Sequence, residues 1–129
     1  MTEILLVDDD VNVRRALSLQ LQDAGYDVRE APNGQVALAM LRQQLSDVII
    51  TDIYMPDGDG LELISQLRTF TQTPVIAMSG GGVYDNPLKM LPVAEVLGAC
   101  RVLQKPFTQE TLIEAIGDAL HPKQAEPDM

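Results

Sequence analysis

Residues 3–10 of this chain read Glu-Ile-Leu-Leu-Val-Asp-Asp-Asp, a short apolar run that ends in three carboxylates. Three later apolar runs also end in polar residues, which are a further carboxylate, Asp52, a hydroxyl, Ser79, and an ammonium, Lys105. If the four runs are parallel strands, their polar ends gather at the carboxyl edge of one sheet. Open α/β sheets bind their ligands at that edge, so the pattern predicts a binding or reaction site there.

The rest of the chain alternates between short β-rich runs and longer stretches with apolar residues at helical spacing. The runs predicted as strands are Glu3–Asp8, Tyr26–Glu30, Asp47–Asp52, Pro74–Met78 and Cys100–Gln104. Regular βα alternation implies a parallel sheet with helices on both faces, because parallel strands need a crossover that is nearly always right-handed. The second run alternates polar and apolar residues and the fifth carries Arg101, which is typical of edge strands. We therefore predict an α/β fold, a flavodoxin-like doubly wound sheet of five parallel strands in the order 2-1-3-4-5.

Length and composition are those of one globular domain. The chain has 129 residues, of which 46% are hydrophobic and 22% charged. It has no apolar stretch near the roughly 20 residues that cross a bilayer and no signal peptide, so we expect a cytoplasmic protein. The net charge of −10 argues against direct binding of nucleic acid or membrane by this domain. We expect the domain to span residues 1–121 and residues 122–129 to form a flexible tail, since the tail has two prolines and no apolar periodicity.

The run of Asp8, Asp9 and Asp10 admits two interpretations. One is helix capping, in which Asp9 or Asp10 accepts hydrogen bonds from the free backbone N–H groups of a helix start. Capping needs only one carboxylate, however, and carboxylates packed beside Asp52 repel one another unless a cation neutralises them. Mg²⁺ suits such a group, because it takes oxygen ligands and needs only one or two carboxylates plus a phosphate. We predict a Mg²⁺ site that coexists with capping, and we assign the helix start to Asp10.

Taken together, the motifs resemble a known family. After the Asp8-Asp9 pair, Asp52 opens the sequence Asp-Ile-Tyr-Met-Pro-Asp-Gly-Asp-Gly, Ser79 ends the fourth run, and Lys105-Pro106-Phe107 ends the fifth. In this order they resemble the receiver domain of two-component response regulators, from about Ile4 to Leu120. The resemblance implies a phosphorylation-dependent signalling switch. It implies no enzyme beyond self-catalysed phosphotransfer and autodephosphorylation.

The resemblance also implies roles for the acids. Asp52 would be the phosphoacceptor, and a histidine kinase or a histidine phosphotransfer protein would be the donor. Asp9, Asp52 and the main-chain carbonyl of Tyr54 would ligate Mg²⁺, while Asp8 would act through metal-bound water. Phosphorylation would change the surface around the fourth helix, the fifth strand and the fifth helix, where an unknown downstream protein would bind.

Ser79 and Lys105 each have a plainer interpretation, as a solvated turn hydroxyl and a solvated charge at a strand end. Their joint placement after the fourth and fifth strands favours the roles that the resemblance implies. Ser79 would donate a hydrogen bond to a phosphoryl oxygen, and Lys105 would form an ion pair with it. Transfer would then depend mostly on positioning and charge neutralisation.

The readout side departs from the family pattern. Val102 stands midway along the fifth strand, where many receivers have an aromatic residue that changes rotamer on activation. The stretch after Ser79 is longer than usual and begins with Gly80–Gly82, which is cheap to rearrange. We therefore expect coupling through this glycine loop to the segment Leu88–Leu97. Tyr54 and Gly81 match positions that flank the phosphoryl group in the family.

Two alternatives of other classes use a similar sheet edge. A haloacid-dehalogenase-like phosphatase also has an aspartate nucleophile and Mg²⁺, but its motif requires Thr or Val where this chain has Asn12. A flavodoxin-like electron carrier would need a hydroxyl-rich phosphate loop after the first strand, and residues 8–12 do not supply one. Phosphate ester turnover would indicate the former, and a bound yellow flavin the latter.

Overall fold

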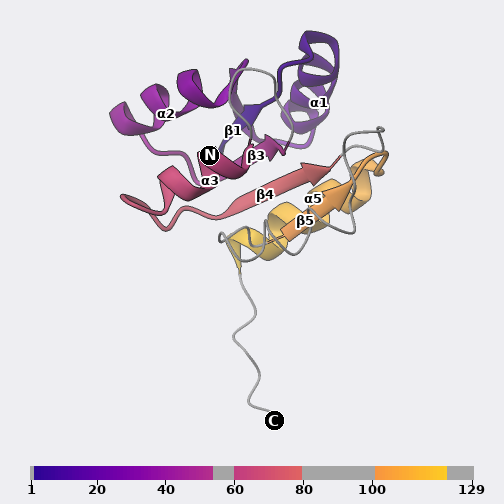
Figure 1. The fold of residues 1–129 in the computed structure, drawn as a ribbon. Helices are drawn as coiled ribbons and strands as arrows, with labels where there is room; N and C mark the ends of the chain where they lie inside the picture. Colours follow the sequence, from indigo (N-terminus) through magenta and orange to yellow (C-terminus); the bar gives the residue numbers. More distant parts are fainter. Residues whose placement is uncertain (1, 54–59, 80–100, 122–129) are drawn as a thin grey trace.

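The computed structural model describes residues 2–53, 60–79 and 101–121. Its strands are β1 (Glu3–Val7), β2 (Asp27–Ala31), β3 (Val48–Asp52), β4 (Val75–Ser79) and β5 (Arg101–Gln104). Its helices are α1 (Val11–Asp23), α2 (Gly34–Gln43), α3 (Gly60–Leu67) and α5 (Gln109–Leu120). Figure 1 shows these elements and carries the same labels.

The five strands form one parallel sheet in the order β2-β1-β3-β4-β5, which confirms the predicted order. The edge strands are β2 and β5, as predicted from their polar residues. Most predicted strand boundaries were wrong by one residue. In particular, β1 ends at Val7 rather than Asp8, and β4 continues to Ser79. Since β1 and β3 are neighbours, with Val7 opposite Thr51, the acids that follow these residues are brought side by side.

Alternate residues of the strands point to opposite faces of the sheet, and each face has its own core. One core joins α2 and α3 to the sheet, and its larger members are Leu5, Leu38, Leu41, Ile49, Ile53, Leu63, Ile64 and Leu67. The other joins α1 and α5 to the sheet, and its larger members are Ile4, Leu6, Leu21, Ile50, Ile76, Met78, Leu103, Leu112 and Ile116. In Figure 1, α2 and α3 lie in the left half of the view and α1 and α5 in the right half. The predicted helices on both faces are thus confirmed.

Two helix starts follow directly from their capping residues. Asp10 is the N-cap of α1, where its carboxylate accepts hydrogen bonds from the backbone N–H groups of Asn12 and Val13. Thr108 is the N-cap of α5, where its hydroxyl accepts from the Thr111 N–H at 3.0 Å. The assignment of Asp10 to the helix start is therefore confirmed. Its neighbours Asp8 and Asp9 remain available for a site at the edge of the sheet.

Several features singled out in the sequence lie outside the described residues, namely Tyr54, Gly80–Gly82 and Leu88–Leu97. Val102 is described: it is half-buried and packs against the core on the α2 and α3 side of the sheet. Coupling through the glycine loop stays a prediction. Across the described ranges, no helix is long and apolar enough to cross a membrane.

Candidate functional site

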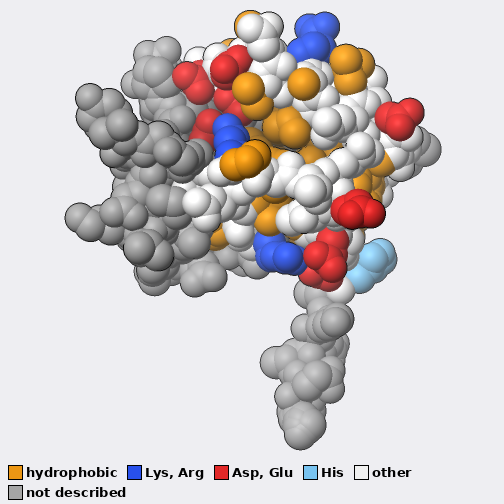
Figure 2. Space-filling view, turned by 90° about the vertical axis from the view of Figure 1, so that its right-hand side faces the viewer, with side chains coloured by type: hydrophobic (Ala, Val, Ile, Leu, Met, Phe, Trp, Pro, Cys, Tyr) orange, Lys and Arg blue, Asp and Glu red, His pale blue; other side chains and the backbone are white. Residues whose placement is uncertain are grey.

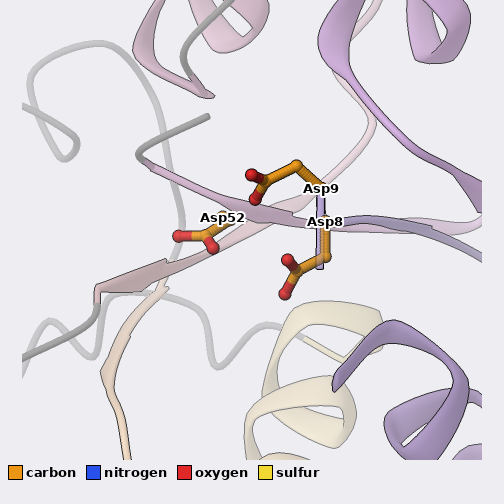
Figure 3. Close-up of side chains that lie close together, drawn as sticks. All are labelled: Asp8, Asp9 and Asp52. Carbon is orange, nitrogen blue, oxygen red and sulfur yellow. The ribbon is translucent and has the colours of Figure 1, made fainter. Parts of the chain in front are cut away.

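Three carboxylates meet beyond the carboxyl ends of β1 and β3. Asp8 and Asp9 follow β1, Asp52 ends β3, and carboxylate oxygens of all three lie within 4.8 Å of one another. Figure 3 shows the three groups turned toward a common space. Asp8 and Asp52 are buried, whereas Asp9 is exposed. The sheet order therefore builds the acidic pocket that the sequence predicted at this edge.

Asp8 is fixed by contacts on several sides. Its backbone N–H donates to the carbonyl oxygen of Ala31 at 3.2 Å, which continues the pairing of β1 with β2 by one residue. Its Oδ1 accepts a hydrogen bond from the Asp10 N–H at 2.9 Å, and its Oδ2 accepts from the Lys105 ammonium at 3.4 Å. A buried carboxylate with these partners is held in one orientation.

Lys105 reaches the pocket from the end of β5. Its Nζ lies 3.1 Å from Asp52 Oδ2 and 3.4 Å from Asp8 Oδ2, so one ammonium bridges acids from two strands. Its own backbone N–H donates to the carbonyl of Ser79 at 2.7 Å, which ties the start of the β5–α5 connection to β4. In Figure 2, acidic side chains cluster toward the upper left with a basic side chain directly beside them.

The charge state of Lys105 follows from these neighbours. Burial lowers the pKa of the ammonium, but the charges of Asp52 and Asp8, together with hydrogen bonds to both, outweigh burial and raise the pKa above its ordinary value of 10.5. Lys105 is therefore a permanent cation at neutral pH. The interpretation of Lys105 as a solvated charge at a strand end was wrong.

Ser79 is the last residue of β4 and is fully buried. It pairs in register with Gln104 of β5, directly before Lys105. A buried strand residue is not a solvated turn hydroxyl, so the plainer interpretation of Ser79 was wrong as well. The end of β4 therefore lies beside the end of β5, next to the residue that contacts Asp52.

Gly60 is a residue of the site that sequence reasoning missed. It begins α3, and its backbone N–H donates to the carbonyl of Ile53 at 2.7 Å. A Cβ added at Gly60 would collide with the carbonyl oxygen of Asp52. Only glycine therefore lets α3 begin this close to the acid at the end of β3. The sequence placed Gly60 in a turn, but it carried no signal that the turn packs against Asp52.

The donor set fits a hard divalent cation. The three carboxylates carry three negative charges when ionised, and Lys105 supplies one positive charge, which leaves two negative charges in the pocket. Carboxylate oxygens are the ligands that Mg²⁺ takes, and the exposed Asp9 keeps one side of the pocket open to solvent. The pocket is thus compatible with Mg²⁺, and with an incoming anion beside it. Tyr54, whose carbonyl was predicted as a further ligand, lies outside the described residues.

Comparison with known proteins identifies the family. The family model of the response regulator receiver domain matches residues 4–117. The chain belongs to this family. This receiver domain is 31% identical to the transcriptional regulatory protein SrrA of Staphylococcus aureus over 111 residues, which cover 86% of this chain and 44% of that protein. The chain thus spans less than half the length of that relative.

Solved structures agree with this assignment. The chemotaxis protein CheY4 of Vibrio cholerae is 36% identical, with a TM-score of 0.82 over 93% of this chain and 99% of that chain. The receiver domain of NtrX from Brucella abortus is 29% identical, with a TM-score of 0.84 over 93% of this chain and 99% of that chain. The predicted flavodoxin-like receiver fold and a phosphorylation-dependent role in two-component signalling are confirmed. The phosphatase and electron-carrier alternatives are not favoured.

Proposed function

We propose that Asp52 is the phosphoacceptor of this receiver domain and that the acidic pocket holds the Mg²⁺ that transfer requires. One observation carries the proposal: three carboxylates meet within 4.8 Å at the end of the sheet, and the Lys105 ammonium lies 3.1 Å from Asp52 Oδ2. A reacting carboxylate, a cation site and a fixed positive charge are the parts that phosphoryl transfer needs.

The proposed metal ligands are those that the resemblance to the family implies, and the three carboxylates that meet in the pocket fit them. Asp9 and Asp52, with the main-chain carbonyl of Tyr54, would hold Mg²⁺ directly, and the buried Asp8 would act through bound water. When bound, Mg²⁺ would neutralise the carboxylates and offset charge on the incoming phosphoryl oxygens. In the transfer, a carboxylate oxygen of Asp52 bonds to phosphorus while the bond from phosphorus to the donor breaks. The electron pair of that bond stays with the leaving group, which is the imidazole nitrogen of a phosphohistidine or the carboxylate of an acyl phosphate.

Two residues would read the product. Phosphorylation would convert one carboxylate oxygen of Asp52 into the bridging oxygen of a mixed anhydride, so Lys105 would exchange its Asp52 partner for a phosphoryl oxygen. The Ser79 hydroxyl donates a hydrogen bond to another phosphoryl oxygen. Contacts that exist only with the phosphoryl group favour one conformation over another, and equal contacts would shift nothing. The readout surface is β5, α5 and the segment that precedes β5.

The partners are proposed at the level of class. The donor is a histidine kinase or a histidine phosphotransfer protein, and the target is a downstream protein rather than nucleic acid or membrane, given the net charge of −10. The domain acts in the cytoplasm and has no turnover beyond its own phosphorylation and dephosphorylation. We propose residues 1–121 as the functional unit.

Intact-mass analysis after incubation with acetyl phosphate tests this proposal. We expect one phosphoryl adduct on the wild-type chain with Mg²⁺ and none without it. Asp52→Asn should abolish the adduct. Asp47→Asn is the matched control, because Asp47 lies directly before β3, at the opposite end from Asp52, and accepts a hydrogen bond from the Glu3 N–H. An adduct that forms without Mg²⁺, or that survives Asp52→Asn, would overturn the assignment.

A further inference from the structure

We propose that Arg14 is a positioning residue for the acidic pocket, and that Glu30 holds Arg14 in place. The inference rests on the proposed Mg²⁺ site. Arg14 lies in the first turns of α1 and does not belong to the pocket itself. Its guanidinium instead contacts the backbone that presents the acids. Arg14 would therefore act on Mg²⁺ through the placement of Asp8 and Asp9.

The side chain of Arg14 joins α1 to β2 and to Asp8, the residue that follows β1. Nη1 donates to the carbonyl oxygen of Asp8 at 2.8 Å, and Nε donates to Glu30 Oε1 of β2 at 2.9 Å. The side chains of Arg14 and Glu30 are only 13% and 24% exposed, so this ion pair is shielded from solvent. The planar guanidinium of an arginine can make both bonds at once in a fixed geometry. A lysine ammonium would hold the same partners with less fixed geometry.

These bonds complete the support of Asp8 by β2. The Asp8 N–H donates to the carbonyl of Ala31, and the Asp8 carbonyl accepts from Arg14, which Glu30 anchors. Glu30 and Ala31 are neighbours on β2. The peptide groups on both sides of Asp8 are therefore held by the same strand, one directly and the other through Arg14. The next residue along the chain is Asp9. A change in the Asp8 carbonyl therefore turns the Asp8–Asp9 peptide and moves both carboxylates relative to Asp52.

Positioning and simple electrostatics predict opposite signs. Arg14 carries a positive charge near the acids, so if charge were its only contribution, its removal would strengthen Mg²⁺ binding. If Arg14 positions the acids, its removal weakens Mg²⁺ binding, because the carboxylates no longer converge. Residues that orient metal ligands in this indirect way commonly change metal affinity by about 10-fold or more.

Arg15 provides a matched control on the same helix. Its Nε lies 3.6 Å from Glu30 Oε2, and its side chain is 65% exposed. Arg15→Met removes the same charge from the adjacent residue as Arg14→Met does, yet leaves the bond to the Asp8 carbonyl intact. The pair of variants therefore separates the effect of charge from the effect of position.

The test is a Mg²⁺ titration of the full chain by isothermal titration calorimetry, with circular dichroism to verify that each variant is folded. We expect Arg14→Met to raise the Kd for Mg²⁺ about 10-fold, and Arg15→Met to leave it unchanged or slightly lower. Glu30→Gln should also raise the Kd, but it should add little in the Arg14→Met background, because it acts through Arg14. If Arg14→Met does not fold, Arg14→Lys carries the same expectation of weaker binding, because it keeps the charge and changes only the geometry of the contacts.

A folded Arg14→Met, or Arg14→Lys in its place, with a Kd equal to or below that of the wild type would overturn the inference. The proposed function would survive that outcome, because the wild-type chain would still bind Mg²⁺. A wild-type chain that bound no Mg²⁺ would overturn both.

Discussion

Strand β5 has a cation at each end, and the two cations have contrasting surroundings. Arg101 begins the strand and contacts two acids of α5, the closer at 2.6 Å. Lys105 follows the strand and contacts Asp8 and Asp52, the closer at 3.1 Å. The side chains of the α5 acids are 70% and 53% exposed, whereas those of Asp8 and Asp52 are 1% and 11% exposed.

The contrast shows that the length of an ion pair does not separate the proposed site from an ordinary surface contact. The shorter contact belongs to Arg101, but exposed ion pairs contribute only about 0–1 kcal/mol, since water and salt screen them. A buried carboxylate that loses its cation is much more costly. Burial of the acids at the carboxyl edge of the sheet, and not the length of the contact, distinguishes the proposed reactive end of β5 from the α5 surface.

The largest expected effect is on phosphoryl transfer. Lys105→Met should slow Asp52 labelling by acetyl phosphate about 100-fold, because it removes a fixed charge from the developing phosphoryl group. Arg101→Met should leave the labelling rate unchanged. Time-resolved intact-mass analysis measures both rates. If both variants slowed Asp52 labelling equally, the two ends of β5 would not differ in their effect on phosphoryl transfer.

The labelling rates of these variants should be compared at neutral pH. The pKa of Lys105 is raised above 10.5 in the folded protein, so its ion pairs contribute fully to stability below that value. The contribution is lost as the pH rises through the raised pKa. At pH 7 the wild type therefore has its complete ion pair.

Gly60 beside Asp52 and Gly117 in α5 differ in how much room each leaves for a side chain. Gly60→Ala should destabilise the fold by about 1–3 kcal/mol, since the new methyl group collides with the Asp52 carbonyl oxygen. Gly117→Ala, in the interior of α5, should stabilise it by about 0.5–1 kcal/mol, because a Cβ there meets no atom within 4 Å. Urea unfolding of both variants measures these changes. A stable Gly60→Ala protein would show that α3 does not press against the end of β3.

The smallest expected effect comes from one acid of the pocket. Asp9→Asn should raise the melting temperature of the Mg²⁺-free protein by about 3 °C, because it relieves repulsion among the carboxylates. The same change should abolish stabilisation by added Mg²⁺. Asp10→Asn is the control: it removes the adjacent charge, and asparagine caps a helix as well as aspartate does. Thermal melts with and without Mg²⁺ give the result, and a response to Mg²⁺ that persists in Asp9→Asn would contradict the metal site.

The sequence predicted the parts of the site that depend on strand order. Once the order 2-1-3-4-5 is assumed, the residues at strand ends must meet, which is why the placement of Asp8, Asp52, Ser79 and Lys105 could be predicted. The contacts that the sequence could not predict depend on how helices sit against the sheet. Gly60 stands in an ordinary turn sequence, and nothing in that sequence indicates its close approach to Asp52.

Arg14 was missed for a related physical reason. A charged residue on an amphipathic helix usually faces solvent, and the spacing of residues 11–23 gave Arg14 and Arg15 the same description. Only the packing of α1 beside β2 separates them, because it brings one guanidinium to Glu30 and the Asp8 carbonyl and leaves the other largely exposed. Adjacent residues of one type can thus differ in their contacts without any local signal in the sequence.

The most direct test of the account is to locate the phosphoryl group. After labelling with acetyl phosphate and Mg²⁺, borohydride reduction of the acyl phosphate converts the labelled aspartate to homoserine, which tandem mass spectrometry identifies in peptides. The account predicts homoserine at position 52 only, with Asp8 and Asp9 unchanged. Homoserine at position 8 or 9, or an unmodified position 52 in a labelled protein, would contradict it.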